Sequence, residues 1–344
     1  MLARSVSSAP RRPRAIVAAC LAGSAAIALA GLPISSSSAA VDCAARTGAN
    51  LDFTGCDLTG ADLSALTGSV KLNNATITNA KLPSSVASWN FTNTKSGGVT
   101  STGLNGIPQY TPVGTKVLKG YVIGPNVNLQ GANLTGVDLT GVSLKGVKSG
   151  RVTGSPTNLP TGTSPFAPGG QSPFKILGGF ILGPEVDLTN ATLSGINLTG
   201  VDIWGSTITG LVSNDLTGTP IALPNYSVLT AGRIIGPGVN LTGANLQGAE
   251  MGSVSLAGAK ASGITGAPAS LPTSTKILGG YILGSGVDLS GANLVGLRLD
   301  GVNLSTSNMS GIKSSRLAGI PQLPAGWKII AGHLVGPGAD LSGV

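Results

Sequence analysis

The residues that could carry out chemistry are few, and the single histidine is the first to consider. His333 stands in a five-residue segment that begins and ends with glycine and occurs five times. The other copies place Tyr121, Phe180, Arg233 and Tyr281 at its position. A general base needs a nucleophile or second acid–base group beside it, and no such constellation accompanies His333. We interpret His333 as a variable scaffold position and predict no catalytic residue.

The aspartates are a second candidate for chemistry. Asp138, Asp187, Asp202 and Asp288 each form the polar member of a five-residue pattern, which explains their spread without a metal ion. A calcium-binding β-roll would need the nonapeptide GGxGxD, and a phosphate-binding loop would need GxxxxGK[ST]. Neither motif occurs in the sequence. We therefore predict no metal site and no cofactor.

Four lysines precede an aliphatic pair at equivalent points of a long repeat, and Ser227 is taken as the replacement in the remaining copy. They are Lys116, Lys175, Lys276 and Lys328. If the repeats stack in whole turns, the lysines form a basic column suited to an anionic wall polymer or a membrane surface. The simpler interpretation, which we favour, is that they are solvated lysines that keep a sheet edge soluble.

Threonines that follow leucines offer another surface, suited to ice or a glycan. They are Thr59, Thr135, Thr140, Thr189, Thr199 and Thr242. Lys145, Gln247 and Val295 interrupt the series, so we rank it below the lysine column.

The element that positions these residues is a five-residue rhythm, clearest at residues 128–147. Leu129, Leu134, Leu139 and Leu144 recur every five residues, and a small residue lies two places before most of them. Residues two apart in an extended segment point the same way, so the leucines face a core and the polar residues face solvent. Glycine then allows the sharp turn. Short staves joined by regular turns predict an all-β solenoid.

Longer units of the chain begin with the glycine-bounded segment. Their first glycines are 59, 53, 48 and 52 residues apart, at Gly120, Gly179, Gly232, Gly280 and Gly332. The five-residue phase ends at Leu-Pro steps such as Leu271-Pro272 and resumes at Ile277, Ile282 and Val287. Proline cannot donate to a ladder, so these Pro-rich segments are predicted loop excursions. The 48-residue unit holds eight staves, which is two whole coils, or nine.

The first 40 residues have the pattern of a secretory signal peptide. Four arginines precede an apolar run, and small residues precede a plausible cleavage site after Ala40. A lipid anchor at Cys20 is the alternative. Of the 21 basic residues 17 remain beyond residue 40, against 13 acidic residues, so the exported part carries +4 instead of +8. The low proportions of charged and aromatic residues argue against nucleic-acid binding. No apolar run after the leader is long enough to span a bilayer.

Two cysteines remain after the leader. Cys43 and Cys56 lie close in sequence near the start of the exported part, and an oxidising compartment favours a disulfide between them. The alternative is that Cys56 is a small core residue, since it stands two before Leu58. Both interpretations stay open.

The repeated segments Ala132-Asn133-Leu134-Thr135-Gly136 and Ala292-Asn293-Leu294-Val295-Gly296 resemble the A(D/N)LxG core of the pentapeptide-repeat family. The resemblance covers most of residues 49–344 and implies a right-handed quadrilateral parallel β-helix with four pentapeptides per coil. The longer unit is similar to exported actinobacterial members of undefined role. The chain also differs from the acidic DNA mimics of this family, because it is basic and exported.

These observations predict a secreted or wall-associated protein with a signal peptide at 1–40 and one β-helix at 41–344. The helix would comprise an N-terminal block at 41–119 and longer units at 120–344. The predicted function is a non-catalytic scaffold or interaction protein; the alternative is a binder of a wall polymer, glycan or membrane surface through the lysine column. An enzyme such as a polysaccharide lyase ranks third. The sequence ends as a new run of pentapeptides begins, which indicates either a truncated record or end-to-end self-association.

Overall fold

The computed structural model describes residues 42–45, 47–77, 80–83, 85–86, 88–91, 108 and 110–343. The chain divides into two units, Met1–Ala40 and Val41–Val344, and the predicted signal peptide with Cys20 lies outside the described residues. The described part is all-β apart from one short 3-10 turn, which confirms the predicted class. A search of these ranges for a helix that could span a membrane finds none.

Staves with an Asn or Asp before the leucine bury the leucine and close with a side-chain hydrogen bond. Leu134 and Leu139 are fully buried, as the rhythm predicts. Between them, the Asp138 carboxylate accepts the backbone N–H and the hydroxyl of Thr140 at 2.9 and 2.7 Å. Gly136 then adopts a φ of 60°, which a residue with a Cβ tolerates poorly. Burial of the leucine contributes about 2 kcal/mol per stave.

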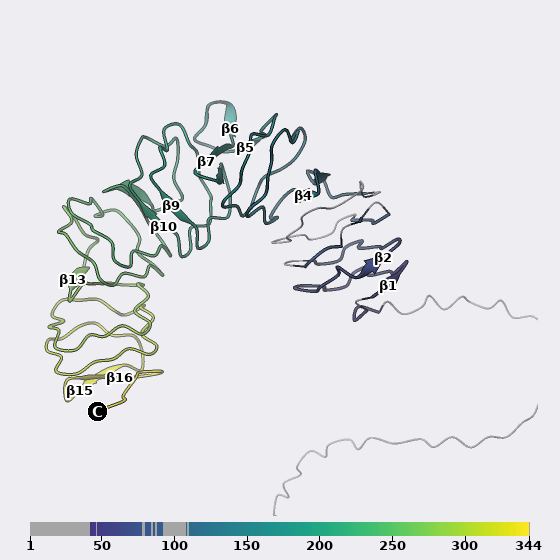
Figure 1. Ribbon diagram of the computed structural model, residues 1–344. Helices are drawn as coiled ribbons and strands as arrows, with labels where there is room; N and C mark the ends of the chain where they lie inside the picture. Colours follow the sequence, from purple (N-terminus) through teal and green to yellow (C-terminus); the bar gives the residue numbers. More distant parts are fainter. Residues whose placement is uncertain are drawn as a thin grey trace, which may run out of the picture. The chain divides into compact units, whose positions relative to one another are not determined.

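Parallel pairing joins each stave to another about one coil further along, where we call four consecutive staves a coil. Bridges connect Asn128 to Lys148 and Asn133 to Thr153, 20 residues apart. Two short parallel ladders do the same: β1 (Gly48–Ala49) with β2 (Leu66–Thr67), and β9 (Thr192–Ser194) with β10 (Val212–Asn214). Figure 1 shows such successive turns stacked between β13 and the C-terminus.

Five antiparallel hairpins interrupt the coils, one at each glycine-bounded segment. They are β3 (Lys116–Leu118) with β4 (Tyr121–Ile123), β7 (Lys175–Leu177) with β8 (Phe180–Leu182), β11 (Val228–Thr230) with β12 (Arg233–Ile235), β13 (Lys276–Leu278) with β14 (Tyr281–Leu283), and β15 (Lys328–Ile330) with β16 (His333–Val335).

The hairpins correct the expectation that Ile277 and Ile282 are consecutive staves of a coil. These two residues pair with each other across the β13–β14 hairpin. The cause is the tip, where Gly279 and Gly280 have φ values of 55° and 76°. Positive φ at both central residues gives the two-residue turn whose twist matches paired antiparallel strands. The chain therefore reverses here instead of continuing around the coil.

The glycine that closes each hairpin is required because the residue before the hairpin packs against it. A Cβ on Gly284 would lie 2.6 Å from Thr275 Oγ1, and a Cβ on Gly183 would lie 2.1 Å from the Phe174 ring. A turn from Pro272 places Thr275, whose N–H donates to the Pro272 carbonyl at 3.1 Å. The predicted Pro-rich excursion is therefore a tight turn that leads into a hairpin.

The 59-residue unit contains an insertion at this same turn. The N–H of Phe174 donates to the Pro160 carbonyl at 3.1 Å, the bond that joins Thr275 to Pro272 in the 48-residue unit. The 13 residues between Pro160 and Phe174 replace two, which accounts for the difference in length. They form β5 (Thr161–Thr163), the 3-10 turn η1 (Pro168–Gly170) and β6 (Gln171–Pro173), with β5 antiparallel to β6.

Unit length also decides where each hairpin lies around the coil. We define a row as residues joined by successive parallel bridges. Asp187, which follows β8, stacks on Lys148. Asn240, which follows β12, instead donates its N–H to the Leu211 carbonyl at 2.9 Å and so lies over Val212, one stave beyond the row of Asp187. The 53-residue unit therefore moves the next hairpin by one row.

The last two units follow the same rule. Asp288 stacks on Lys260, which stacks on Asn240, so the 48-residue unit spans two whole coils and keeps its row. Asp340 stacks on Lys313, which stacks on Asn293, one stave further along. The hairpins consequently occupy three different rows.

Candidate ligand-binding pockets

The four lysines of the predicted basic column do not share one row. Lys116 and Lys175 begin hairpins in the same row, whereas Lys276 lies one row further and Lys328 two rows further, because the hairpins that carry them are displaced. The predicted replacement is also wrong, since Val228, not Ser227, occupies the lysine position opposite Ile235. A single column across all units is therefore not formed.

Three of these lysines support the coil that follows their hairpin. The Lys116 ammonium donates to the Thr140 carbonyl at 2.5 Å, and Lys175 donates to the Gly200 carbonyl at 2.7 Å. Lys276 donates to the Asp300 carbonyl in the same way. A hydrogen bond from a charged donor to a turn carbonyl stabilises the turn. Lys328 is exposed at the start of β15.

The two cysteines form a disulfide. Cys43 and Cys56 are joined, with their Cα atoms 5.5 Å apart. The Cys56 side chain is at the same time buried in the core, so both interpretations of this residue hold. The bond ties residue 43 to the first described coil.

The variable position at the start of each second strand anchors the hairpin to the coil. His333 Nδ1 lies 2.8 Å from the Ser314 carbonyl oxygen, and the Arg233 guanidinium donates to the Ser213 carbonyl at 2.6 Å. The Tyr281 hydroxyl accepts the Asn293 N–H at 3.2 Å. This contact pattern supports the interpretation of His333 as a scaffold residue.

The aspartates serve the turns of the staves. Hydrogen bonds from the Asn158 amide and from Thr140 hold the pKa of Asp138 at about 2. Bonds from Ser64, with Lys81 nearby, hold the pKa of Asp62 at about 2 as well. Among the described residues, no three His, Cys, Asp or Glu side chains gather to hold a metal ion.

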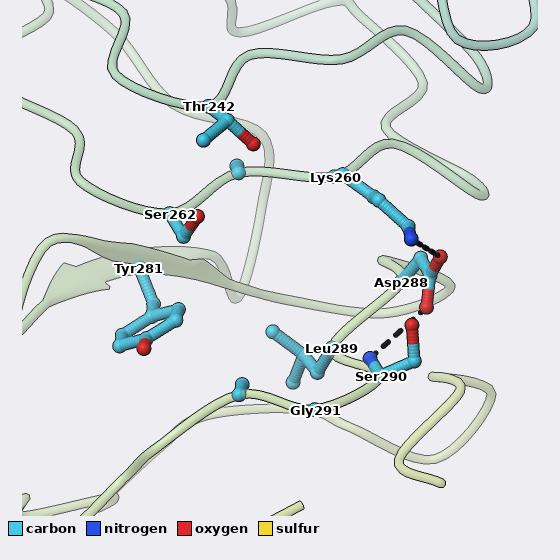
Figure 2. Close-up of a pocket in the computed structure, with 10 residues that line it drawn as sticks. Thr242, Lys260, Ser262, Tyr281, Asp288, Leu289, Ser290 and Gly291 are labelled. Carbon is cyan, nitrogen blue, oxygen red and sulfur yellow. Dashed lines mark hydrogen bonds and ion pairs between the residues drawn. The ribbon is translucent and has the colours of Figure 1, made fainter. Parts of the chain in front are cut away.

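A small pocket lies between the β14 strand and the staves on either side of it. Its lining includes Tyr281, Lys260, Asp288, Leu289 and Ser290, and its volume is about 110 Å³. Figure 2 shows the Tyr281 ring on one side and the Lys260–Asp288 pair on the other, with Leu289 between them. The pocket thus combines an aromatic ring with opposite charges and hydroxyl groups.

The charged pair in this pocket is held in place by its neighbours. Lys260 Nζ lies 3.5 Å from Asp288 Oδ2, while Asp288 Oδ1 accepts the Ser290 N–H at 3.0 Å and the Asn308 amide at 2.9 Å. Burial by itself would raise the pKa of Asp288. Hydrogen bonds from Ser290 and the charge of Lys260 outweigh burial and lower the pKa. The carboxylate is therefore charged at neutral pH.

An equivalent pocket lies at the β8 strand. Phe180 takes the place of Tyr281, Lys148 that of Lys260, and Asp187 that of Asp288, while Thr189 corresponds to Ser290. The volume is about 300 Å³. Its lining also includes Arg151. We name the two sites the Tyr281 pocket and the Phe180 pocket.

Sequence reasoning did not identify these pockets. It treated the aromatic position as scaffold and did not consider Lys148 or Lys260, because each occupies the stave position of an Asn or Asp. One signal was present: Lys148 and Lys260 each stand 20 residues after an asparagine, Asn128 and Asn240. Each lysine is followed in its row by an aspartate, Asp187 or Asp288. A hairpin lies between the lysine and the aspartate in the sequence, so a coil length of 20 does not predict that pairing unless the hairpin is also predicted.

Residues 125–148, 238–264 and 285–313 match the family of pentapeptide repeats, in 8 copies. No curated protein matches the chain. Among solved structures the chain is similar to HetL, a pentapeptide repeat protein involved in heterocyst differentiation regulation from the cyanobacterium Nostoc sp. strain PCC 7120. The identity is 18%, the match covers 82% of this chain and 88% of HetL, and the TM-score is 0.19.

Proposed function

Because the chain carries pentapeptide repeats, we propose that it is an exported, non-catalytic scaffold whose coils form a right-handed quadrilateral β-helix. The observation that carries the proposal is the use of the polar side chains. Asp138 and the equivalent Asn and Asp residues bond to their own turns, and Lys116, Lys175 and Lys276 bond to carbonyls of the following coil. Within the described ranges these polar side chains are committed to holding the fold, which supports a scaffold in preference to a catalyst.

Export is tested by expressing the full chain in a secreting bacterial host. The protein is expected in the medium or wall fraction, with its N-terminus at Val41 or close to it. A matched variant lacking residues 2–40 should stay inside the cell. If the full chain stays inside with its leader uncleaved, the export part of the proposal is wrong.

The scaffold part is tested on the purified exported protein. We expect no cleavage of acidic polysaccharides, measured as new reducing ends or unsaturated products. Release of such products would favour a polysaccharide lyase instead. A basic column binding an anionic polymer is a weaker alternative, since its lysines lie in three rows and three of them already bond to carbonyls.

A further inference from the structure

We propose that the Tyr281 pocket and the Phe180 pocket are sugar-binding sites, each taking one ring of a neutral surface glycan. This inference rests on the proposed function, since a glycan is a partner for an exported protein. It replaces the lysine column as the ligand-binding part of the molecule.

The chemistry of the Tyr281 pocket fits a polyhydroxylated ring. An aromatic side chain offers an apolar face of the kind that packs against the C–H face of a sugar. The Lys260 ammonium donates hydrogen bonds and the Asp288 carboxylate accepts them, as alternating hydroxyl groups require. Ser262 and Thr242 add hydroxyls that can do both. An apolar wall with a few convergent polar groups is the usual composition of a small-molecule site.

The charge balance argues for a neutral ligand in the Tyr281 pocket. One cation and one anion line it, so the carboxylate or phosphate of an acidic ligand would lie against Asp288. The side chain of Asp288 is only 18% exposed, whereas that of Lys260 is 56% exposed. The ammonium can therefore turn toward a ligand, while the carboxylate is fixed.

The site is also ordered before any ligand arrives. Tyr281 is held at both ends, because its backbone pairs with Leu278 and its hydroxyl accepts the Asn293 N–H. Asp288 is fixed by Ser290 and Asn308. Side chains that are already immobilised lose little further entropy on binding.

Recurrence supplies independent support. The Phe180 pocket presents a ring, a lysine and an aspartate from the same three positions, two units earlier in the chain. The Phe180 ring lies against Gly150, where an added Cβ would be 3.4 Å from Cε1. The intervening hairpin differs: Arg233 takes the ring position, and Val212 with Asn240 replaces the lysine and the aspartate. That hairpin provides a matched control.

The test uses the purified full chain after export, with cellotetraose, chitotetraose and maltotetraose as neutral probes and polygalacturonate as the acidic one. Saturation-transfer NMR and calorimetry should detect binding of at least one neutral probe with a dissociation constant in the millimolar range or lower. This constant should not change in roughly 0.5 M salt, which screens interactions between exposed charges.

Substitutions then locate the binding. Tyr281→Leu combined with Phe180→Leu should abolish binding. Asp288→Asn should weaken binding about tenfold at the Tyr281 pocket, by removing a charged acceptor, and leave the Phe180 pocket unchanged. If Asp288→Asn lowers the melting temperature, Lys260→Gln takes its place, and Arg233→Ala should leave sugar binding unchanged. Equal thermal midpoints show that the variants are folded.

Three outcomes overturn the inference. They are no binding of any neutral probe at millimolar concentration, salt-sensitive binding of polygalacturonate alone, and binding that survives the loss of both rings. Failure of this inference can be distinguished from failure of the proposed function. A chain that stays in the cytoplasm but binds a neutral probe through both pockets would refute export and leave the sugar-binding inference standing.

Discussion

The closing glycine of the β13–β14 hairpin gives the sharpest test of the fold that builds the Tyr281 pocket. Gly284 has a φ outside the left-handed region, so an alanine there is strained only by contact. Its Cβ would lie 2.6 Å from Thr275 Oγ1 and 3.2 Å from Thr275 Cβ. Forcing a methyl group into such a space costs about 1–3 kcal/mol. We expect Gly284→Ala to destabilise the hairpin by that amount.

A second glycine serves as a control, because substitution there is opposed by backbone conformation and not by contact. Gly291 has a φ of +69°, and no atom lies within 4 Å of an added Cβ. Gly291→Ala should therefore cost only the backbone penalty of the left-handed region, about 1–2 kcal/mol. A repeat protein does not always unfold in one step, so urea unfolding by circular dichroism is paired with hydrogen exchange at the Ile282 amide.

The double substitution separates contact from other causes. Thr275→Ala removes the oxygen and the methyl group that crowd Gly284, so it should restore much of the loss in Gly284→Ala and none of the loss in Gly291→Ala. Failure of Thr275→Ala to rescue Gly284→Ala, or equal rescue of both variants, would show that contact with Thr275 is not what makes Gly284 necessary.

Three further predictions concern other parts of the chain. Because the pKa of Asp138 is about 2 in the folded protein and near 4 when unfolded, its contribution to stability is present above about pH 4 and lost as the pH falls toward 2; Asp138→Asn should flatten the acid dependence of the melting temperature over that window. Replacing Cys43 and Cys56 by serine should lower the free energy of unfolding by about 3 kcal/mol, measured by urea titration, and no change would show that the bond closes no restrictive loop. Replacing residues 161–173 by Ala-Gly, the two residues that follow Pro324, should preserve the melting temperature. It should also shift Trp204 fluorescence to longer wavelength, because it removes the Phe166 ring, whose centroid lies 6.4 Å from that of Trp204. A large fall in the melting temperature would show that residues 161–173 are not a removable insertion.

The core could be predicted from sequence because its period is unlike that of any other regular structure. Leu129, Leu134 and Leu139 recur at intervals that no helix or long strand produces, and all three are buried. The coil of four staves was instead implied by the resemblance to pentapeptide repeats, and the 20-residue bridges from Asn128 to Lys148 and from Asn133 to Thr153 agree with it. In the N-terminal block the bridge from Asp52 to Lys71 spans 19 residues, one fewer than the 20 residues of the bridge from Asn128 to Lys148.

The hairpins were missed because a two-residue turn imitates the repeat. Residues that flank such a turn pair at a separation of five, as Ile277 does with Ile282. Five is also the length of one stave, so the aliphatic positions stay in phase whether the chain continues or reverses. The distinguishing signal was the pair of residues at the tip, Gly279 and Gly280, which favours reversal.

Unit length sets limits on how the two pockets can be used. The Phe180 pocket is built on the row of Lys148 and Asp187, and the Tyr281 pocket on the row of Lys260 and Asp288, one stave further around the coil. The shift comes from the single extra stave of the 53-residue unit. A straight polymer lying along one row would therefore reach only one of the pockets, so each is expected to bind its sugar ring independently, and titration should give two sites without cooperativity.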